Sequence, residues 1–371
     1  MVFVIWCLLH VPVGYKKKAR TMDIGIILTF AKEKGASDLH ISSGEPPIVR
    51  IDGDIQKVDM PSLPKEEVHS MLYDILNDHQ RMIFEEKKEI DFAIDIKGIA
   101  RYRVNAFHKS NGEAIVFRTI PARVLTLEEL GLPGILADFT KRSKGLVLVT
   151  GPTGSGKSTT LAALIDFINQ NQKAHILTIE DPIEFVFESK LSLINQRELG
   201  TDTHSFANAL RSALREDPDV IMVGEMRDLE TISLAMTAAE TGHLVFATLH
   251  TSSAAKTVDR IIDVFPPEQQ NQIRTMFSES IIAVITQNLL QRSDGNGRVA
   301  ALEIMIGTPA VRNLIREGKI AQIPGMMQTG KMYGMQTMDA TLVELLQEGM
   351  VSKETVTPYL SSSSVLSSYG E

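Results

Sequence analysis

The stretch Gly151-Pro-Thr-Gly-Ser-Gly-Lys-Ser-Thr159 has the spacing G-x-x-x-x-G-K-S, followed by a threonine. A short apolar run rich in β-branched residues, Gly145 to Thr150, precedes it, and apolar residues at helical spacing, Leu161 to Ile168, follow it. A strand, a glycine loop and a helix in this order are the context that a phosphate-binding loop requires. The sequence therefore predicts such a loop at residues 151–159, and a chance match in a glycine-containing turn is the alternative.

The residue types of this loop predict its chemistry. Its glycines allow backbone conformations that a Cβ hinders, so the loop's N–H groups can converge on phosphate oxygens at a helix N-terminus. Lys157 is expected to reach the β- and γ-phosphates of ATP, and the Ser158 hydroxyl to hold Mg²⁺. The expected nucleotide-binding residues are Gly151, Pro152, Thr153, Gly154, Ser155, Gly156, Lys157, Ser158 and Thr159.

Length and composition limit the classes of protein. The chain has 371 residues, which favours two or three domains, and 43% of them are hydrophobic, as in ordinary globular proteins. The formal net charge of −8 argues against a nucleic-acid-binding protein. Cys7 is the one cysteine, so the chain can form neither an internal disulfide nor a thiolate zinc site, which fits a reducing compartment.

The first 21 residues are unusual, because an apolar run from Met1 to His10 is followed by four basic residues between positions 16 and 20. A secretory signal has the reverse order, and the run is too short to span a bilayer. Two interpretations remain: a segment that touches a membrane, or an extension ahead of Met22 as the natural initiator. We favour the second, because a well-patterned helix begins at Asp23, a good N-cap. No later run is long enough to predict a transmembrane helix.

The order of predicted elements indicates two domains. Helices and strands between residues 22 and 120 indicate an α+β domain. In the second domain, predicted strands at 145–150, 175–179, 219–223, 243–249 and 298–306 alternate with helices, which predicts a largely parallel sheet with its ligand at the carboxyl edge. The expected parts are an N-terminal extension (1–21), the α+β domain (22–120), a linker with a hinge at Pro121–Leu125 (121–144), the α/β domain (145–360) and a disordered, serine-rich tail (361–371).

Acidic residues end two of these predicted strands. Glu180, Asp181 and Glu184 follow the strand from His175, and we consider them, with Ser158, as candidates for binding Mg²⁺ through the nucleotide. The alternative is that such an acid only caps a helix. Glu225 follows Gly224, which stands where an ordinary Mg²⁺-binding segment has an aspartate. Glu225 can still accept a proton from, or orient, the water that attacks the γ-phosphate.

Two histidines flank the strand at 243–249. His243 and His250 are separated by seven residues, roughly 20 Å or more along a strand, so they do not indicate a shared metal site. His250 lies at the end of the sheet where the nucleotide is expected, so it is the candidate γ-phosphate sensor. The alternative is a structural role, which a single histidine at a strand end often has.

Together these segments resemble the secretion-superfamily hexameric ATPases, and within them the PilT-type retraction motors of type IV pili. The resemblance runs from about Met22 to Glu348. It includes the nucleotide loop, the family's Asp box at Ile179–Phe185, its atypical Walker B segment at Asp217–Asp228 and its His box at Thr241–Ser253. Residues 310–317, Ala-Val-Arg-Asn-Leu-Ile-Arg-Glu, are similar to the family's AIRNLIRE motif, which is associated with retraction, with Val311 in place of isoleucine.

The resemblance implies an α/β fold class in which a PAS-like α+β N-terminal domain precedes a RecA-like P-loop ATPase domain. It implies that Glu225 is the catalytic glutamate; the residues themselves add Lys157 and His250 as catalytic candidates. It also implies that arginines of a neighbouring subunit reach the nucleotide, and the candidates are Arg101, Arg103 and Arg118. From the residues alone, a polar strand face is usually only solvated, although arginine suits a transition-state phosphate because it can bind it bidentately.

The function that the resemblance implies is an ATP-hydrolysing hexameric motor for pilus retraction, pilus disassembly and twitching motility. The implied partners are five further copies of the chain in a homohexamer, an inner-membrane pilus platform protein and a paralogous retraction ATPase, with no nucleic acid and no zinc. The implied location is cytoplasmic, peripheral to the inner membrane at the pilus base.

Other functions remain open at this point. An accessory retraction ATPase, or a secretion or pilus-assembly ATPase of the same superfamily, is the first alternative. Many assembly and secretion members carry a tetracysteine zinc insert, and this chain has no cysteine after Cys7. From other classes, a RecA-like nucleic-acid translocase is disfavoured by the acidic balance, and a nucleotide-binding regulator with little hydrolysis is the third possibility. Residues 310–317 favour the primary retraction motor.

Overall fold

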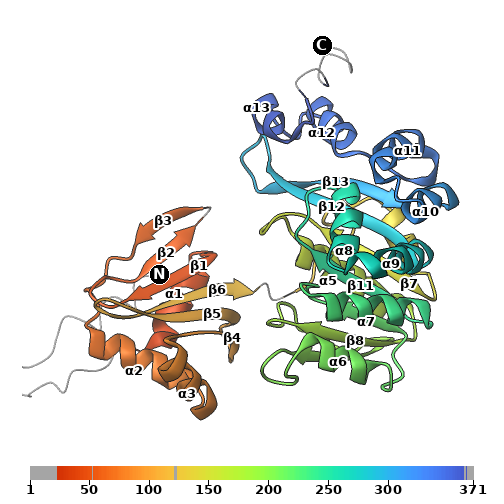
Figure 1. The fold of residues 1–371 in the computed structure, drawn as a ribbon. Coiled ribbons are helices and arrows are strands. Elements are labelled where there is room, and N and C mark those ends of the chain that lie inside the picture. The colour runs from red at the N-terminus through yellow and green to blue at the C-terminus, as the bar shows by residue number, and fades with distance from the viewer. Residues whose placement is uncertain (1–22, 52, 121–122, 363–364, 366–371) are drawn as a thin grey trace, which may run out of the picture. The chain divides into compact units, whose positions relative to one another are not determined.

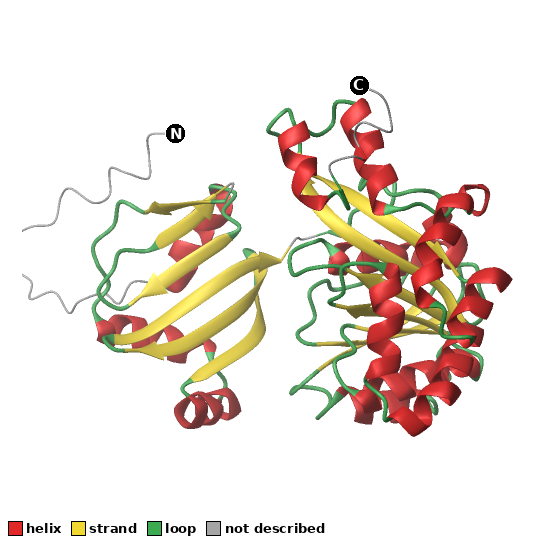
Figure 2. Cartoon of the chain, turned by 45° about the horizontal axis from the view of Figure 1, so that its top comes forward, coloured by secondary structure: helices red, strands yellow, loops and turns green. Residues whose placement is uncertain are grey.

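The computed structural model describes residues 23–51, 53–120, 123–362 and 365 (Figure 1, Figure 2). Contacts divide the chain into two units, Met1–Ala122 and Arg123–Glu371. Each unit has its own sheet and its own hydrophobic core. The predicted extension at 1–21, the start of the predicted hinge at Pro121 and most of the tail at 361–371 lie outside the described residues.

The described part of the first unit is an antiparallel six-stranded sheet with helices packed on one face. Alternate strand residues such as Leu39, Val104 and Phe117 are buried against these helices, as expected of a sheet with one covered face. Asn77 begins the third helix through a reciprocal capping box with Gln80. The order is β3-β2-β1-β6-β5-β4, with α1 (Ile24–Glu33), β1 (Asp38–Ser42), β2 (Ile48–Ile51), β3 (Asp54–Lys57), α2 (Lys65–Ile75), α3 (Asp78–Lys87), β4 (Glu89–Ile96), β5 (Ala100–Lys109) and β6 (Gly112–Ile120).

The second unit is built on a seven-stranded sheet with the order β13-β12-β7-β11-β10-β8-β9. The strands pair in parallel except β13, which is antiparallel to β12. The parallel pairing brings the carboxyl ends of β7, β10 and β11 to one edge. The strands are β7 (Gly145–Thr150), β8 (His175–Glu180), β9 (Leu193–Glu198), β10 (Val220–Val223), β11 (Leu244–Leu249), β12 (Ile281–Gln291) and β13 (Arg298–Ile306).

Helices cover both faces of this sheet (Figure 1). Leu146 and Leu148 of β7 belong to the core under α7, α8 and α9, whereas Val147 and Val149 belong to the core under α4 and α5. A strand buried on both faces explains the continuous apolar run in the sequence. The helices are α4 (Ile135–Phe139), α5 (Lys157–Asn171), α6 (Phe206–Ala213), α7 (Leu229–Glu240), α8 (Ala254–Asp263), α9 (Pro267–Ser280), α10 (Pro309–Arg316), α11 (Ile323–Thr329), α12 (Met338–Gln347) and α13 (Lys353–Val356).

The predicted fold class is confirmed, because an α+β unit precedes an α/β unit whose glycine loop joins β7 to α5. The structure adds β3, β9 and β12, which the sequence analysis did not predict. β3 and β9 are short edge strands, and β12 follows α9 directly. No turn separates that helix from the strand, so the sequence pattern gave no signal for the change at Ile281.

The junction between β13 and α10 is tightly packed. A Cβ on Gly307 would lie 2.2 Å from the carbonyl oxygen of Ile281. Arg312 closes the same junction, because its guanidinium donates to the carbonyl oxygens of Gly307 (2.7 Å), Glu279 (2.8 Å) and Ile281 (2.9 Å). Arg312 belongs to the motif at residues 310–317, so this arginine holds α10 on the sheet.

We expect Gly307→Ala to destabilise the second unit by about 1–3 kcal/mol, because the added Cβ overlaps a backbone oxygen that no side-chain rotation can move. Gly325→Ala is the matched control, since Gly325 lies inside α11 and an added Cβ there meets nothing within 4 Å. Alanine at that position is expected to stabilise the helix by up to about 1 kcal/mol. Thermal unfolding measures both changes, and an unaltered melting temperature in Gly307→Ala would contradict the packing argument.

Candidate active site

The loop between β7 and α5 has a backbone that requires glycine at two positions. Gly151 and Gly156 have positive φ angles of 140° and 89°. A Cβ on Gly151 would lie 2.3 Å from the carbonyl oxygen of Gln287, and a Cβ on Gly156 would lie 2.8 Å from the Gln287 Nε2 atom. Glycine is therefore needed at both positions for conformation and for space.

The polar groups of this loop fit a phosphate. Ser155 is 3% exposed, and its hydroxyl has no hydrogen-bond partner among the described residues. Ser158 and Thr159 lie in the first turn of α5, at a helix N-terminus, which favours anions. A buried hydroxyl without a protein partner and a helix N-terminus suit phosphate oxygens, so the residues present fit the phosphates of the predicted ATP.

Lys157 lies inside the loop and is 8% exposed. Its ammonium donates to the carbonyl oxygens of Gly151 and Pro152, both at 2.9 Å, and lies 3.4 Å from Nδ1 of His250. Burial lowers the pKa of Lys157, and the carboxylates of Glu225 and Glu184 oppose that shift. The cation is therefore held in the loop, partly desolvated, at the place where the sequence predicted phosphate binding.

Glu225 lies at the same edge of the sheet, two residues beyond the end of β10. Its carboxylate contacts Arg227 (Oε2 to Nη2, 2.8 Å) and His250 (Oε1 to Nε2, 3.3 Å). Burial pushes the pKa of Glu225 up, but the hydrogen bond and charge of Arg227, together with His250, outweigh burial and hold the pKa below its usual value. Contacts therefore connect Arg227, Glu225, His250 and Lys157 in series.

Backbone contacts between β10 and β11 position this series. The two strands pair in parallel, the Thr248 hydroxyl donates to the Gly224 carbonyl, and the Met226 N–H donates to the Thr248 carbonyl (3.0 Å). Gly224 stands where an ordinary Mg²⁺-binding segment has an aspartate. A Cβ added to Gly224 would lie 3.2 Å from the carbonyl oxygen of Ile179. Close packing against the end of β8 therefore explains the glycine.

The acidic segment at the end of β8 contains Glu180, Asp181 and Glu184. Glu180 is buried: its carboxylate accepts from the Thr178 hydroxyl (2.7 Å) and the Gln196 amide (3.2 Å), and burial raises its pKa to about 7. Asp181 and Glu184 are close enough to influence Arg227 and Lys157 electrostatically. Within the described residues no three His, Cys, Asp or Glu side chains gather as a metal site. Metal binding by these three acids stays a prediction.

Arg101, Arg103 and Arg118 share the uncovered face of the first unit's sheet. Arg103 is directly opposite Arg118 across β5 and β6, and Arg101 is two residues from Arg103, so the three side chains lie on one face. The Arg103 guanidinium contacts Asp91 (Nη2 to Oδ2, 2.6 Å), and Arg118 contacts Asp38 (Nε to Oδ1, 2.9 Å). The alternation in the sequence predicted a polar face for Arg101 and Arg103, the structure adds Arg118 to it, and contact with a nucleotide stays a prediction.

Three residues at the site were not predicted from the sequence. Arg227 contacts Glu225, and its position two residues further in the same segment was an available signal. Thr160 and Gln287 contact each other beneath the loop, at 2.8 Å between the Thr160 hydroxyl and the Gln287 Oε1 atom. Gln287 lies on β12, a strand that the sequence analysis did not predict, so no sequence signal indicated it.

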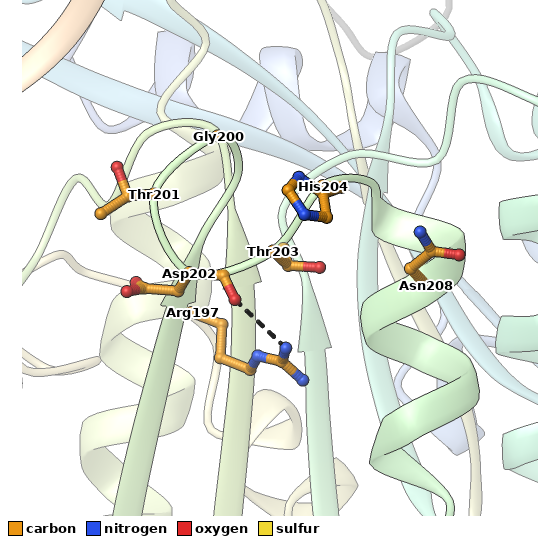
Figure 3. A pocket seen from close by; sticks show the side chains of 7 residues that line it. All are labelled: Arg197, Gly200, Thr201, Asp202, Thr203, His204 and Asn208. Atoms are coloured by element: carbon orange, nitrogen blue, oxygen red, sulfur yellow. Dashed lines mark hydrogen bonds between the residues drawn. The ribbon is translucent and has the colours of Figure 1, made fainter. Parts of the chain in front are cut away.

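Of two cavities in the second unit, the larger adjoins the phosphate loop and the smaller does not. Pro152 and His250 line a cavity of about 1200 Å³, which also reaches Lys256 and Glu303, so open space adjoins the predicted phosphate site. A smaller pocket of about 260 Å³ lies between the end of β9 and the start of α6 (Figure 3). Arg197 donates to the Asp202 carbonyl (3.3 Å) there, and none of the predicted site residues line it.

Comparisons with known proteins show which proteins this chain resembles. A chain of 59% identity, which covers 90% of this chain and 96% of its own length, is "Type IV pilus retractation ATPase PilT" of Pseudomonas aeruginosa. "Twitching motility protein" of Neisseria gonorrhoeae is 61% identical and covers 83% of this chain and 82% of its own length. Among solved structures, the pilus retraction motor PilT with bound ADP has a TM-score of 0.87 at 47% identity and covers 94% of this chain and 99% of its own.

No helix in the described part of the chain is long and apolar enough to cross a membrane. The family model described as "Type II/IV secretion system protein" matches residues 17–344, which is most of the chain and includes every candidate site residue. The chain therefore belongs to the Type II/IV secretion system protein family.

Proposed function

We propose that this protein is an ATPase motor that drives retraction of type IV pili. The observation that carries the proposal is the series of contacts from Glu225 through His250 to Lys157 at a glycine loop. Two relatives with 59% and 61% identity are named as a pilus retraction ATPase and as a twitching motility protein. Assembly as a homohexamer, docking to an inner-membrane platform protein from the cytoplasm and cooperation with a paralogous ATPase belong to the same proposal.

The residues of the site have distinct roles in hydrolysis of ATP to ADP and phosphate. Lys157 and the backbone N–H groups of the non-proline residues in 151–159 bind the β- and γ-phosphates. Glu225 stays ionised at neutral pH because its pKa is lowered, so it can accept the proton of the attacking water. His250 contacts both Glu225 and Lys157. Its role is therefore to sense the γ-phosphate and to transmit its presence to these two residues. Ser158 would hold Mg²⁺ together with the nucleotide, and the ion would neutralise charge on the phosphates.

The arginines of the first unit complete the proposal. We propose that Arg101, Arg103 and Arg118 of one subunit stabilise the transition-state charge on the nucleotide of its neighbour. Their placement on one sheet face supports this, because several guanidinium groups on one face can bind a polyphosphate together. The acidic contacts of Arg103 and Arg118 then hold these side chains before ATP arrives.

The first test replaces the proposed base. Glu225→Gln keeps the shape of the side chain but removes the proton acceptor, so we expect ATP turnover to fall by about 10²–10⁴-fold while ADP binding persists. In a strain that lacks the native protein, this variant is expected to leave twitching absent and pili in excess. Glu344→Gln, on the exposed face of α12, is the control. Wild-type turnover in Glu225→Gln would favour a nucleotide-binding regulator over a motor.

The second test uses the pH dependence of catalysis. A base with a lowered pKa is active above that pKa and loses activity as the pH falls through it. Arg227→Met removes the hydrogen bond and charge that offset burial of Glu225, so the pKa of Glu225 should rise and the acidic limb of kcat/KM should move to higher pH. Arg215→Met, on an exposed turn, is the matched control. An acidic limb at the wild-type pH would mean that Glu225 is not the group that titrates.

The third test concerns the first unit. Arg103→Ala is expected to lower turnover by about 10-fold or more while nucleotide affinity and ring formation persist, because the arginine acts on transition-state charge. Turnover, ADP affinity and sedimentation are measured together. Arg50→Ala, on the same sheet face, is the control. An equal loss in both variants would assign the effect to the general charge of the face, and unchanged turnover would remove Arg103 from the mechanism.

A further inference from the structure

Gln287 holds the phosphate loop with both ends of its amide. It is 2% exposed and lies on β12, next to β7 in the sheet. Its Nε2 donates to the Ser155 carbonyl (2.7 Å), and its Oε1 accepts from the Thr160 hydroxyl (2.8 Å). Because a carbonyl can only accept, the Ser155 contact fixes which end of the amide faces the loop. The loop and the first turn of α5 are therefore tied to one side chain.

Gln287 also leaves no space for a Cβ at two positions of the loop. Its carbonyl oxygen occupies the space that a Cβ on Gly151 would take, and its Nε2 atom occupies that of a Cβ on Gly156. The neighbouring pair of hydroxyls, Thr150 and Thr286 (2.9 Å), joins β7 to β12 immediately before the loop. One residue of β12 thus touches the beginning, the middle and the end of the loop.

We propose that Gln287 is a positioning residue for nucleotide binding, which holds residues 151–156 in the conformation that receives the phosphates. A loop that is already ordered does not lose conformational entropy when the ligand binds, so its affinity is higher. The proposed ATPase function is the basis of this inference, because the ligand is the ATP or ADP of that function. Gln287 itself touches the loop and not the reacting atoms.

A different account is that Gln287 only stabilises the fold. That account predicts a lower melting temperature with unchanged nucleotide affinity in the folded protein. A positioning role predicts weaker binding of both ATP and ADP, since loop order contributes equally to ground state and transition state. Such uniform binding raises KM and leaves kcat near its original value.

The decisive variant is Gln287→Met, which removes both hydrogen bonds and keeps the volume of the side chain. We expect KM for ATP and Kd for ADP to rise by about tenfold, with kcat changed by less than about threefold, because two hydrogen bonds to the loop are lost. Steady-state ATPase assays and calorimetric titration with ADP on the full chain measure these values. The matched control is Gln172→Met, at the other end of α5, where the amide donates to the Thr140 carbonyl (2.9 Å).

Variants of Thr160 test the same positioning role independently. Thr160→Val removes the hydroxyl that donates a hydrogen bond to Gln287 Oε1, while Thr160→Ser keeps this hydroxyl. We expect weaker ADP binding in Thr160→Val and recovery in Thr160→Ser. The double variant with Gln287→Met should bind no more weakly than Gln287→Met alone, because both changes remove the same contact.

The outcomes separate this inference from the proposed function. If the wild-type protein neither hydrolyses ATP nor binds ADP, both the proposed function and the positioning role are overturned. A wild-type protein that hydrolyses ATP, with unchanged KM and Kd in Gln287→Met and Thr160→Val, would overturn the positioning role alone. If Gln287→Met does not fold, the Thr160 pair decides: weaker binding in valine with recovery in serine supports the role, and equal binding in both overturns it.

Discussion

The close approach of β12 to the phosphate loop determines the geometry of the site. Gly151 and Gly156 let the backbone and amide of Gln287 come within contact distance of the loop, and residues with a Cβ would push the strands apart. In the sheet order, β12 lies on one side of β7, while β11 and β10 lie on the other. The loop is therefore held from one side, and its other side faces His250 and Glu225, which follow β11 and β10.

This arrangement also explains the electrostatics of Lys157. The ammonium is buried among neutral carbonyls of its own loop, and the nearest opposite charges are Glu225 and Glu184. A phosphate oxygen is a stronger acceptor than a carbonyl for the same cation, because the phosphate oxygen carries negative charge. A partly desolvated cation gains more from such a partner than an exposed one does. Lys157 thus favours a polyphosphate over water as its partner.

The sequence predicted those features that depend on local pattern or on shared strand ends. The loop, β7 and α5 follow from adjacent residues, and Glu225 and His250 meet because parallel strands end at one edge. Side-chain direction at a strand end has no such signal, so the contacts of Glu180 with Thr178 and Gln196 were not predicted. β12 was missed because α9 leads into it without a turn, and with it Gln287 was missed.

The same strand continues from the loop into the C-terminal helices. Leu290, three residues beyond Gln287, packs in a cluster with Leu342 of α12 and Val351. On the partner strand β13, the Glu303 carboxylate accepts the Ala254 N–H (2.6 Å) at the start of α8, directly after the segment that contains His250. β12 and β13 are joined by a continuous antiparallel ladder. Gln287 therefore connects the phosphate loop to the pair of strands that contacts both the start of α8 and the C-terminal helices.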